Sequence, residues 1–214
     1  MAERKRPRRT RERIVENSLA MFNRLGEPNV TTADIAGEMG ISPGNLYYHF
    51  SNKDEIVGEL FAALERRLDA LLDARVSGSV NVEDLWLFLH LVFEAMWEYR
   101  FFYRDLDEIL SRSRKLAAHF ASIMHRFTAT VSALCQSMVD DGAMRASQRE
   151  IAAIADNVTL VATFWISYQR IAVEQPDAAT ANLDRAAYQV LSLIAPFLQG
   201  PSRRLLDRLS EDYL

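Results

Sequence analysis

The segment 31–50, TTADIAGEMGISPGNLYYHF, is the feature that most constrains this fold. Thr31 followed by Asp34 is a capping residue with an acid three positions later, which predicts the start of a short helix. Gly40 suits a tight turn that a β-carbon would obstruct. Ser42 then caps a second helix whose first residue is a proline, the position where proline fits best. The segment therefore predicts two short helices joined by a tight turn, a helix-turn-helix.

The second of these helices has two different faces. Leu46 and Phe50 stand four residues apart and face inward. They meet an apolar wedge of Ile35, Met39 and Ile41, beside the small Ala36. The residues left to face outward are Gly44, Asn45, Tyr47, Tyr48 and His49. Such a face suits a DNA groove, because hydroxyls and imidazole reach phosphates and an amide can read a base edge. The alternative is a helical hairpin whose tyrosines pack on a neighbouring helix.

Helical signals continue along the whole chain, and no run has strand or hairpin chemistry. A first helix is predicted from Thr10 to Leu25. A capping box of Ser51 and Asp54 opens a long helix to Ala74, and another is formed by Ser147 and Glu150. Further helices are predicted at about 82–99, 101–112, 115–141, 148–174, 181–199 and 203–211, with a hinge at 76–80 and helix ends at Pro176 and at Gly200-Pro201. The predicted class is all-α.

Composition and charge narrow the possible functions. Hydrophobic residues make up 49% of the chain, enough to bury a core, and the single Cys135 excludes an internal disulfide or a cysteine-cluster metal site. No stretch reaches about 18 consecutive apolar residues, so no membrane span is expected. The first thirteen residues carry seven basic and two acidic side chains, whereas residues 51–214 have a net charge of −6. A basic arm over 1–8 on an acidic body indicates a polyanion at one end, or a solubilising tail.

The segment 8–60 resembles the N-terminal DNA-binding domain of the TetR family of bacterial transcriptional regulators. The resemblance rests on the helix-turn-helix, on the run Tyr47-Tyr48-His49-Phe50 and on Lys53. It implies a three-helix DNA-binding domain over 9–53, with the helix-turn-helix at 31–50. A long fourth helix would join it, as a lever, to a helical ligand-binding and dimerisation domain over 54–214.

The resemblance also implies roles for individual residues. Thr32 would place a hydroxyl on a phosphate at a helix N-terminus. Tyr47 and His49 would bind phosphates, Lys53 would clamp the flanking backbone, and Tyr48 could do either phosphate or base contact. The residues implied to approach base edges are Ser42, Pro43, Gly44 and Asn45. Because Pro43 and Gly44 offer no hydrogen-bonding side chain, base selection falls on Asn45 and Tyr48, or on DNA shape and the Arg4–Arg13 arm.

The acidic remainder is expected to bind an effector and a second copy of the chain. Residues 85–103 hold eight aromatic side chains, and an aromatic pocket with His90 as its polar group is one interpretation; a plain bundle core is the other. The pocket candidates are Trp86, His90, Phe93, Trp97, Phe127 and Phe164. Resemblance places the dimer interface on the helices at 148–174 and 181–199. The interface candidates are Ile154, Val158, Val161, Trp165, Val190, Ile194 and Phe197.

The function expected is a dimeric regulator, a repressor released from a palindromic operator in double-stranded DNA by a small hydrophobic effector. An effector-independent architectural DNA-binding protein and an activator on the same fold are the alternatives. No nucleophile elbow, phosphate loop or metal-ligand spacing is present, so neither an enzyme nor a cofactor is expected. The expected location is the bacterial cytoplasm, at the nucleoid.

Overall fold

The structure is a computed structural model that describes residues 7–73, 81–172 and 179–211, with side chains described over 9–73, 81–172 and 183–208. Residues 1–6 of the arm predicted over 1–8, the predicted hinge at 76–80 and the helix end predicted at Pro176 lie outside the described residues, whereas Pro7 and Arg8 belong to the first helix, α1 (Pro7–Leu25). The chain forms two compact units. The first contains the described residues up to Arg66 together with Tyr99–Ala117, and the second contains the described residues of 67–98 and 118–214.

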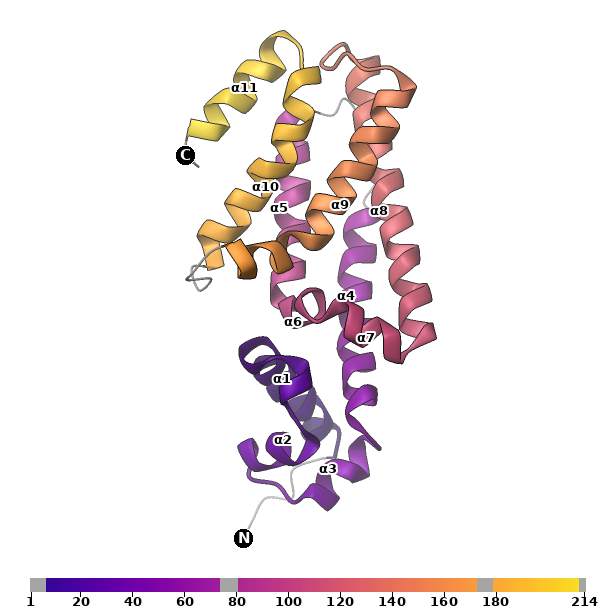
Figure 1. The fold of residues 1–214 in the computed structure, drawn as a ribbon, viewed down its shortest axis with the longest axis vertical. Coiled ribbons are helices and arrows are strands. Elements are labelled where there is room, and N and C mark those ends of the chain that lie inside the picture. The colour runs from indigo at the N-terminus through magenta and orange to yellow at the C-terminus, as the bar shows by residue number, and fades with distance from the viewer. Residues whose placement is uncertain (1–6, 74–80, 173–178, 212–214) are drawn as a thin grey trace. The chain divides into compact units, whose positions relative to one another are not determined.

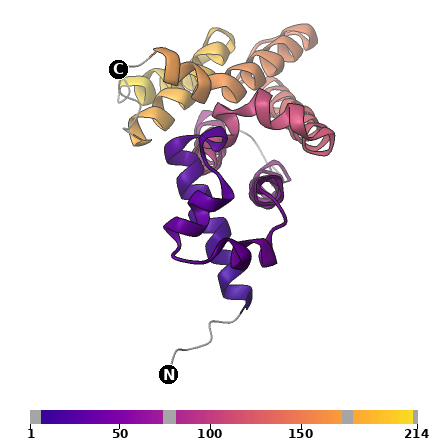
Figure 2. The ribbon, with the colours of Figure 1, turned by 60° about the horizontal axis from the view of Figure 1, so that its bottom comes forward.

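The first unit combines the helices at the start of the chain with two helices from later in the chain (Figures 1 and 2). Its elements are α1 (Pro7–Leu25), the 3-10 turn η1 (Glu27–Asn29), α2 (Thr32–Glu38), α3 (Pro43–His49), the first part of α4 (Lys53–Leu72), α6 (Arg100–Arg104) and α7 (Leu106–Arg112). α1 begins at Pro7, three residues before the predicted start. Arg11, which was predicted to belong to the basic arm, lies in α1, pairs with Glu59 of α4 at 2.8 Å and lies over the Phe50 ring.

Aromatic rings form the core of the first unit. Phe22 of α1 packs on Phe101 of α6 with ring centroids 5.3 Å apart, and Phe61 of α4 packs on Phe102 at 5.0 Å. All four rings are buried. The Arg104 guanidinium donates to the carbonyl oxygen of Phe22 at the end of α1, which also accepts the Gly26 N–H. α6 and α7 are therefore integral parts of this unit.

The second unit is a helical bundle. Its elements are the end of α4, α5 (Val82–Glu98), α8 (Arg114–Asp140) from residue 118, α9 (Gln148–Ala172), α10 (Ala179–Ile194), η2 (Ala195–Phe197) and α11 (Gly200–Glu211). α10 packs against both α5 and α9 (Figure 1). Among the described helices, α9 alone has the length and hydropathy to cross a membrane, and 44% of that stretch is buried inside the protein.

The structure confirms an all-α fold. Across the described ranges, the only β pairing is one isolated bridge between Met144 and Leu198. The capping boxes of Thr31 with Asp34 and of Ser147 with Glu150 are both present. The predicted box of Ser51 and Asp54 is wrong by one residue, because Asn52 accepts the Glu55 N–H while the Glu55 carboxylate accepts the Ser51 N–H.

Other predicted helix boundaries also differ from the structure. The helix predicted at 101–112 breaks at Asp105, whose carboxylate accepts the Glu27 N–H at 3.0 Å and so serves a distant loop. The helix predicted to reach residue 199 ends at Ile194, since Pro196 follows and helices stop before proline. Gly200 and Pro201 open α11 rather than merely closing the preceding helix.

Candidate nucleic-acid interface

Local sequence chemistry builds the helix-turn-helix as predicted. Thr31 and Asp34 cap α2, and Gly40 takes a φ of 63° in the turn, a conformation that favours glycine. The Ser42 hydroxyl accepts the Asn45 N–H at 3.2 Å at the start of α3. The hydrogen bonds from Thr31, with its side-chain contribution first, lower the pKa of Asp34. These caps fix the angle at which α3 leaves the turn.

The inward face of α3 is buried as predicted. Leu46 and Phe50 are 0% and 2% exposed, and they meet the buried Ile35 and Ala36 of α2. Met39 and Ile41 are half-buried at the edge of this wedge. Since α3 is only two turns long, the packing of two large side chains holds it in place. Its other residues can therefore face outward and contact a partner.

The outward face of α3 is polar and aromatic. Tyr47 and Tyr48 are 52% and 77% exposed, and Asn45 is exposed beside them. The Tyr47 hydroxyl lies 3.0 Å from the Thr32 hydroxyl, which brings two phosphate-binding candidates together. Half-buried His49 meets the Tyr48 ring edge-on, with centroids 5.0 Å apart. These rings are not packed away against a neighbouring helix, as the alternative of a simple hairpin required.

The first turn of α3 offers space rather than contacts. Ser42, Pro43 and Gly44 are all exposed. A β-carbon built on Gly44 would find its nearest neighbour, the Ser42 hydroxyl oxygen, 4.0 Å away. Polar contact with a base from this turn therefore depends on Ser42 and Asn45, because the two residues between them carry no hydrogen-bonding side chain.

Lys53 is placed differently from what the resemblance implies. Its ammonium nitrogen lies 3.0 Å from the Oε1 atom of Glu27 and donates a hydrogen bond of 2.9 Å to the Glu27 carbonyl oxygen. Only 22% of the side chain is exposed. A lysine expected to clamp the DNA backbone is thus engaged inside the protein, between the loop after α1 and the start of α4.

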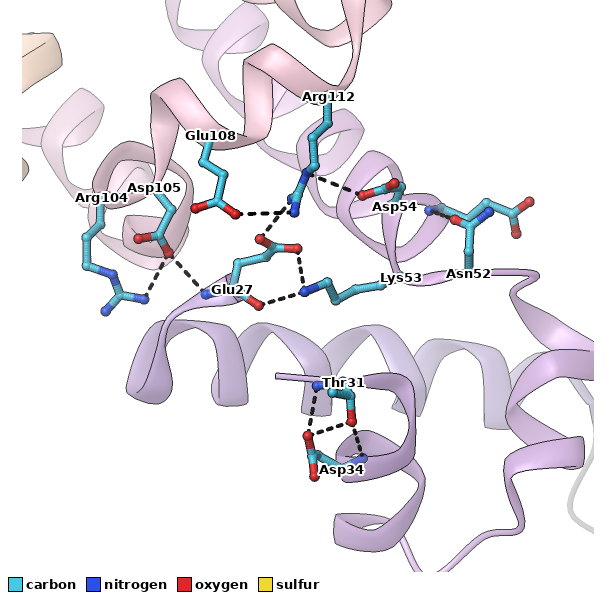
Figure 3. Close-up of polar contacts among 11 residues, drawn as sticks. Glu27, Thr31, Asp34, Asn52, Lys53, Asp54, Arg104, Asp105, Glu108 and Arg112 are labelled. Atoms are coloured by element: carbon cyan, nitrogen blue, oxygen red, sulfur yellow. Dashed lines mark hydrogen bonds and ion pairs between the residues drawn. The ribbon is translucent and has the colours of Figure 1, made fainter. Parts of the chain in front are cut away.

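Glu27 is itself buried and is the centre of an ionic cluster that Figure 3 shows. Its carboxylate is 0% exposed and receives Lys53 on one oxygen and Arg112 of α7, at 2.8 Å, on the other. Arg112 also lies 3.7 Å from both Asp54 and Glu108. Burial works against the charge on Arg112, but the bond from Glu27 outweighs it together with the surrounding carboxylates, so the pKa of Arg112 is raised. No sequence motif marked Glu27, because its partners lie 26 and 85 positions away.

The predicted effector residues occupy several different environments in the second unit. Trp86 stacks on His90 with ring centroids 5.0 Å apart, and the two imidazole nitrogens lie 3.6 Å from Glu94 and 3.7 Å from Asp184. Phe93 and Phe127 are buried, and half-buried Trp97 lies four residues after Phe93 on α5. Phe164 does not join them, since it is 43% exposed on α9.

The residues predicted for the dimer interface differ in how deeply they are buried. Val158, Val190 and Ile194 are 0% exposed and Ile154 is 4% exposed, so these side chains form the core of the chain's own bundle and have no surface left for a second copy. Trp165 is nearly buried, whereas Val161 and Phe197 are half-buried. α9 instead exposes a different set of apolar side chains, Leu160, Phe164, Tyr168 and Ile171.

Three of these exposed residues, Leu160, Phe164 and Tyr168, border a groove between α9 and α10. The groove encloses about 360 Å³ and is lined by Leu160, Val161, Phe164, Trp165, Tyr168, Arg185 and Gln189. The lining residues from α9 are aliphatic or aromatic, whereas α10 contributes the charged Arg185 and the amide of Gln189. We name the exposed set Leu160, Phe164, Tyr168 and Ile171 the α9 apolar face.

Groups that could perform other chemistry were also located. Cys135 is fully buried, and burial raises the pKa of its thiol to about 11, so it is an inert thiol at neutral pH. Within 7–73, 81–172 and 179–211, no three His, Cys, Asp or Glu side chains are grouped so as to hold a metal ion.

A helix-turn-helix with an exposed polar recognition face, followed by a helical bundle, defines a DNA-binding regulator as the class of protein. Comparison with known sequences agrees. The profile described as "Bacterial regulatory proteins, tetR family" matches residues 14–60, and the profile described as "Bacterial transcriptional repressor" matches residues 63–206. The chain belongs to the TetR family, whose members are DNA-binding transcriptional regulators and not enzymes.

Solved structures and curated relatives extend the comparison. A TetR-family regulator from Marinobacter aquaeolei VT8 is 35% identical, with 95% of this chain and 98% of that chain covered and a TM-score of 0.87. SmeT, solved in complex with triclosan, is 20% identical with a TM-score of 0.59 over 90% of this chain and 93% of its own, and shows the shared fold. The regulator TtgR of Pseudomonas putida is 39% identical over 75 residues, which is 35% of each chain. The match thus spans about a third of that curated relative.

Proposed function

We propose that the protein is a dimeric, sequence-specific repressor whose hold on its operator is released by a small hydrophobic effector. The observation that carries this proposal is the outward face of α3, where Tyr47 and Tyr48 stand exposed next to Asn45 while Leu46 and Phe50 anchor the helix. Exposed aromatic side chains with polar tips suit a surface that meets phosphates and base edges.

The proposed contacts with DNA lie on α2 and α3. The paired hydroxyls of Thr32 and Tyr47 face one phosphate, which the N-terminus of α2 also favours. His49 binds a second phosphate. Asn45 and Tyr48 read bases in the major groove, with Ser42, Pro43 and Gly44 close enough to sense the shape of the base pairs.

The α9 apolar face is proposed as the surface of the homodimer. One short recognition helix reads too few base pairs, whereas two heads about 34 Å apart read both halves of a palindrome. Exposed leucine, isoleucine and two aromatic side chains in one patch mark an interaction site on a protein surface. Val161 and Trp165 line the same groove and would be covered with it.

The effector is proposed to bind in the second unit beside Trp86 and His90. The indole nitrogen of Trp86 is buried and has no hydrogen-bond partner among the described residues, so a ligand acceptor would satisfy it. Phe93, Trp97 and Phe127 would supply apolar contacts. The complex of SmeT with triclosan shows that a protein of this fold accommodates a small molecule. Such a ligand need only favour the state that binds DNA less well.

The test is a fluorescence-anisotropy titration against the duplex upstream of the protein's own gene, at two salt concentrations and with nonspecific competitor. Tight, competitor-resistant and salt-sensitive binding supports the proposal, and the Asn45→Ala variant serves as the matched control that should lose specificity. The test becomes decisive when the protein also selects duplexes from a random-sequence pool and the enriched duplexes are titrated in the same way. If wild-type protein enriches no competitor-resistant duplex, sequence-specific binding is refuted and the architectural alternative stands. Candidate small hydrophobic effectors are then added to the protein–DNA complex. Release of the DNA by one of them separates the repressor from the architectural alternative.

A further inference from the structure

The ionic cluster around Glu27 creates a competition that the DNA-binding proposal does not include. A phosphate can attract Lys53 only if its ammonium leaves the Glu27 carboxylate, which it approaches to 3.0 Å, and the Glu27 carbonyl oxygen, to which it donates. Because Glu27 is fully buried, that carboxylate has no access to water as a replacement partner. In the free protein, Lys53 is therefore held by the buried Glu27 carboxylate, whose negative charge needs a cation beside it.

Arg112 supplies the second neutralising charge. It approaches the other oxygen of Glu27 at 2.8 Å, so one buried carboxylate is shared by two cations (Figure 3). Each cation weakens the hold of the carboxylate on the other, since both stabilise the same negative charge. Arg112 also lies 3.7 Å from Asp54, one residue after Lys53, and keeps that second carboxylate occupied.

We propose that Glu27 is a positioning residue for DNA binding: its carboxylate holds Lys53 away from the phosphate backbone, and Arg112 of α7 sets how readily Lys53 is released. The inference rests on the proposed function, because it requires a DNA phosphate as the competing partner. Contact between Arg112 and Glu27 loosens Lys53 and favours DNA binding. Withdrawal of Arg112 leaves the Glu27 carboxylate to pair with Lys53 alone.

Chain connectivity links α7 directly to the helix that follows it. A single residue, Ser113, separates α7 from α8, the long helix that continues into the second unit. α7 is only seven residues long, and Arg112 is its last residue. A displacement passed along α8 therefore reaches Arg112 first, and changes the Glu27 contact without any need to repack α3.

The first test measures Lys53 directly and uses no DNA. The chain has three lysines, Lys5, Lys53 and Lys115, and Lys115 is exposed on α8. Limited acetylation followed by peptide mass spectrometry gives the rate at Lys53 relative to Lys115 in the same sample. We expect Lys53 to react several-fold more slowly than Lys115 in the wild type, faster in Glu27→Gln, and more slowly still in Arg112→Gln. Arg112→Lys, which keeps the charge, should resemble the wild type.

The two substitutions should change the acetylation rate of Lys53 in opposite directions, which separates this proposal from a purely structural role of the cluster. If the cluster only held the fold together, both substitutions would loosen the region and both would raise the reactivity of Lys53. A lower rate in Arg112→Gln cannot arise from local unfolding. If Glu27→Gln does not fold, as circular dichroism would show, the pair Arg112→Gln and Arg112→Lys still decides the question. Equal rates at Lys53 and Lys115 in the wild type, or a raised rate in Arg112→Gln, would overturn the proposal.

The second test measures the DNA consequence with a fluorescein-labelled random-sequence duplex, because phosphate contacts do not depend on sequence. Each phosphate contact contributes about 0.9 to the slope of log affinity against log salt. Glu27→Gln should steepen the slope by about 0.9 for each DNA-binding domain. The double variant Glu27→Gln with Lys53→Gln should not show this steeper slope. Arg112→Gln should make the slope shallower. Unchanged slopes with the expected lysine reactivities would reject the DNA step alone, whereas failure of wild-type protein to bind any duplex would reject the proposed function instead.

Discussion

The recognition face of α3 and the α9 apolar face both leave aromatic side chains in water, but they differ in what surrounds them. On α3 the exposed rings are tyrosines, accompanied by an amide and a hydroxyl on a helix of two turns. On α9 they are a phenylalanine and a tyrosine among leucine and isoleucine, along a helix of 25 residues. The same observation of exposure thus indicates a charged, hydrated partner in one place and a second protein surface in the other.

The difference teaches that exposure alone does not identify a partner. A face with many hydrogen-bonding tips gains little from excluding water and much from meeting phosphates. A face of hydrocarbon gains from burial in proportion to the area covered, roughly 25 cal/mol per Å². Substitutions on the two faces test this difference most strongly, and substitutions at the helix caps of the two units test it more weakly.

The largest effect is expected from a charge on the α9 apolar face. Phe164→Glu should convert the dimer to a monomer, because a buried carboxylate without a partner opposes association. Specific DNA affinity should then fall towards the nonspecific level, about 10³-fold or more. Sedimentation velocity and anisotropy measure the two effects. Ala152→Glu is the control, exposed on α9 about 120° around the helix from Phe164. If the Phe164→Glu variant remained a dimer, the α9 apolar face would not be the dimer interface.

A smaller effect is expected on the recognition face. Asn45→Ala should cost about 1–3 kcal/mol of discrimination at one base pair and leave binding to unrelated duplexes unchanged. Tyr47→Phe removes only a hydroxyl, and should weaken binding to every duplex alike. Anisotropy against the operator and a panel of single-base variants distinguishes the two patterns. Uniform weakening by Asn45→Ala would show that this amide contacts the backbone and not a base.

Matched helix caps sharpen the comparison between the two units. Thr31→Ala and Ser147→Ala remove the same kind of capping hydroxyl, from α2 and from α9. Each should cost about 1 kcal/mol of stability, visible in thermal unfolding as a shift of roughly 2–4 °C. Only Thr31→Ala should also weaken DNA binding, since its cap holds the helix next to α3. Equal loss of DNA affinity in both variants would mean that the caps act through global stability.

The smallest effect concerns pH. The bond from the Thr31 hydroxyl, followed by that from its backbone, lowers the pKa of Asp34 below its ordinary 3.8, and the bond from the Ser147 backbone N–H, followed by that from its hydroxyl, lowers the pKa of Glu150 below 4.5. A lowered folded-state pKa contributes stability that is complete above the unfolded value and is lost as pH falls through the folded value. Asp34→Asn and Glu150→Gln should therefore flatten the fall in urea midpoint below about pH 4.5, and leave the pH dependence near neutrality as it is.

Local chemistry accounts for what could be predicted from the sequence. The start of α2, the turn at Gly40, the cap of α3 and its two faces depend on residues within a few positions of one another. Each follows from one hydrogen bond or one helical period. For the same reason most long helices of the second unit were placed within a few residues of their observed bounds.

Long-range contacts account for what could not be predicted. The break at Asp105 exists because its carboxylate serves the Glu27 N–H, 78 positions earlier. The position of Lys53 depends on Glu27, which no motif marks. The stripes of α9 were visible in the sequence, but periodicity cannot say which stripe the protein's own bundle covers. Burial assigned Val158 to the inside and left Leu160 and Phe164 outside.

Gly44 carries a consequence for how such a protein changes over time. The site on α3 where its side chain would stand is open, with the nearest atom 4.0 Å from a β-carbon. A single codon change can therefore install a new base-reading group without disturbing the helix, and alanine there would even stabilise it by about 0.5–1 kcal/mol. If α3 reads the operator as proposed, a substitution at Gly44 would let a duplicated copy of the gene acquire its own targets while the fold and the helical bundle stay intact.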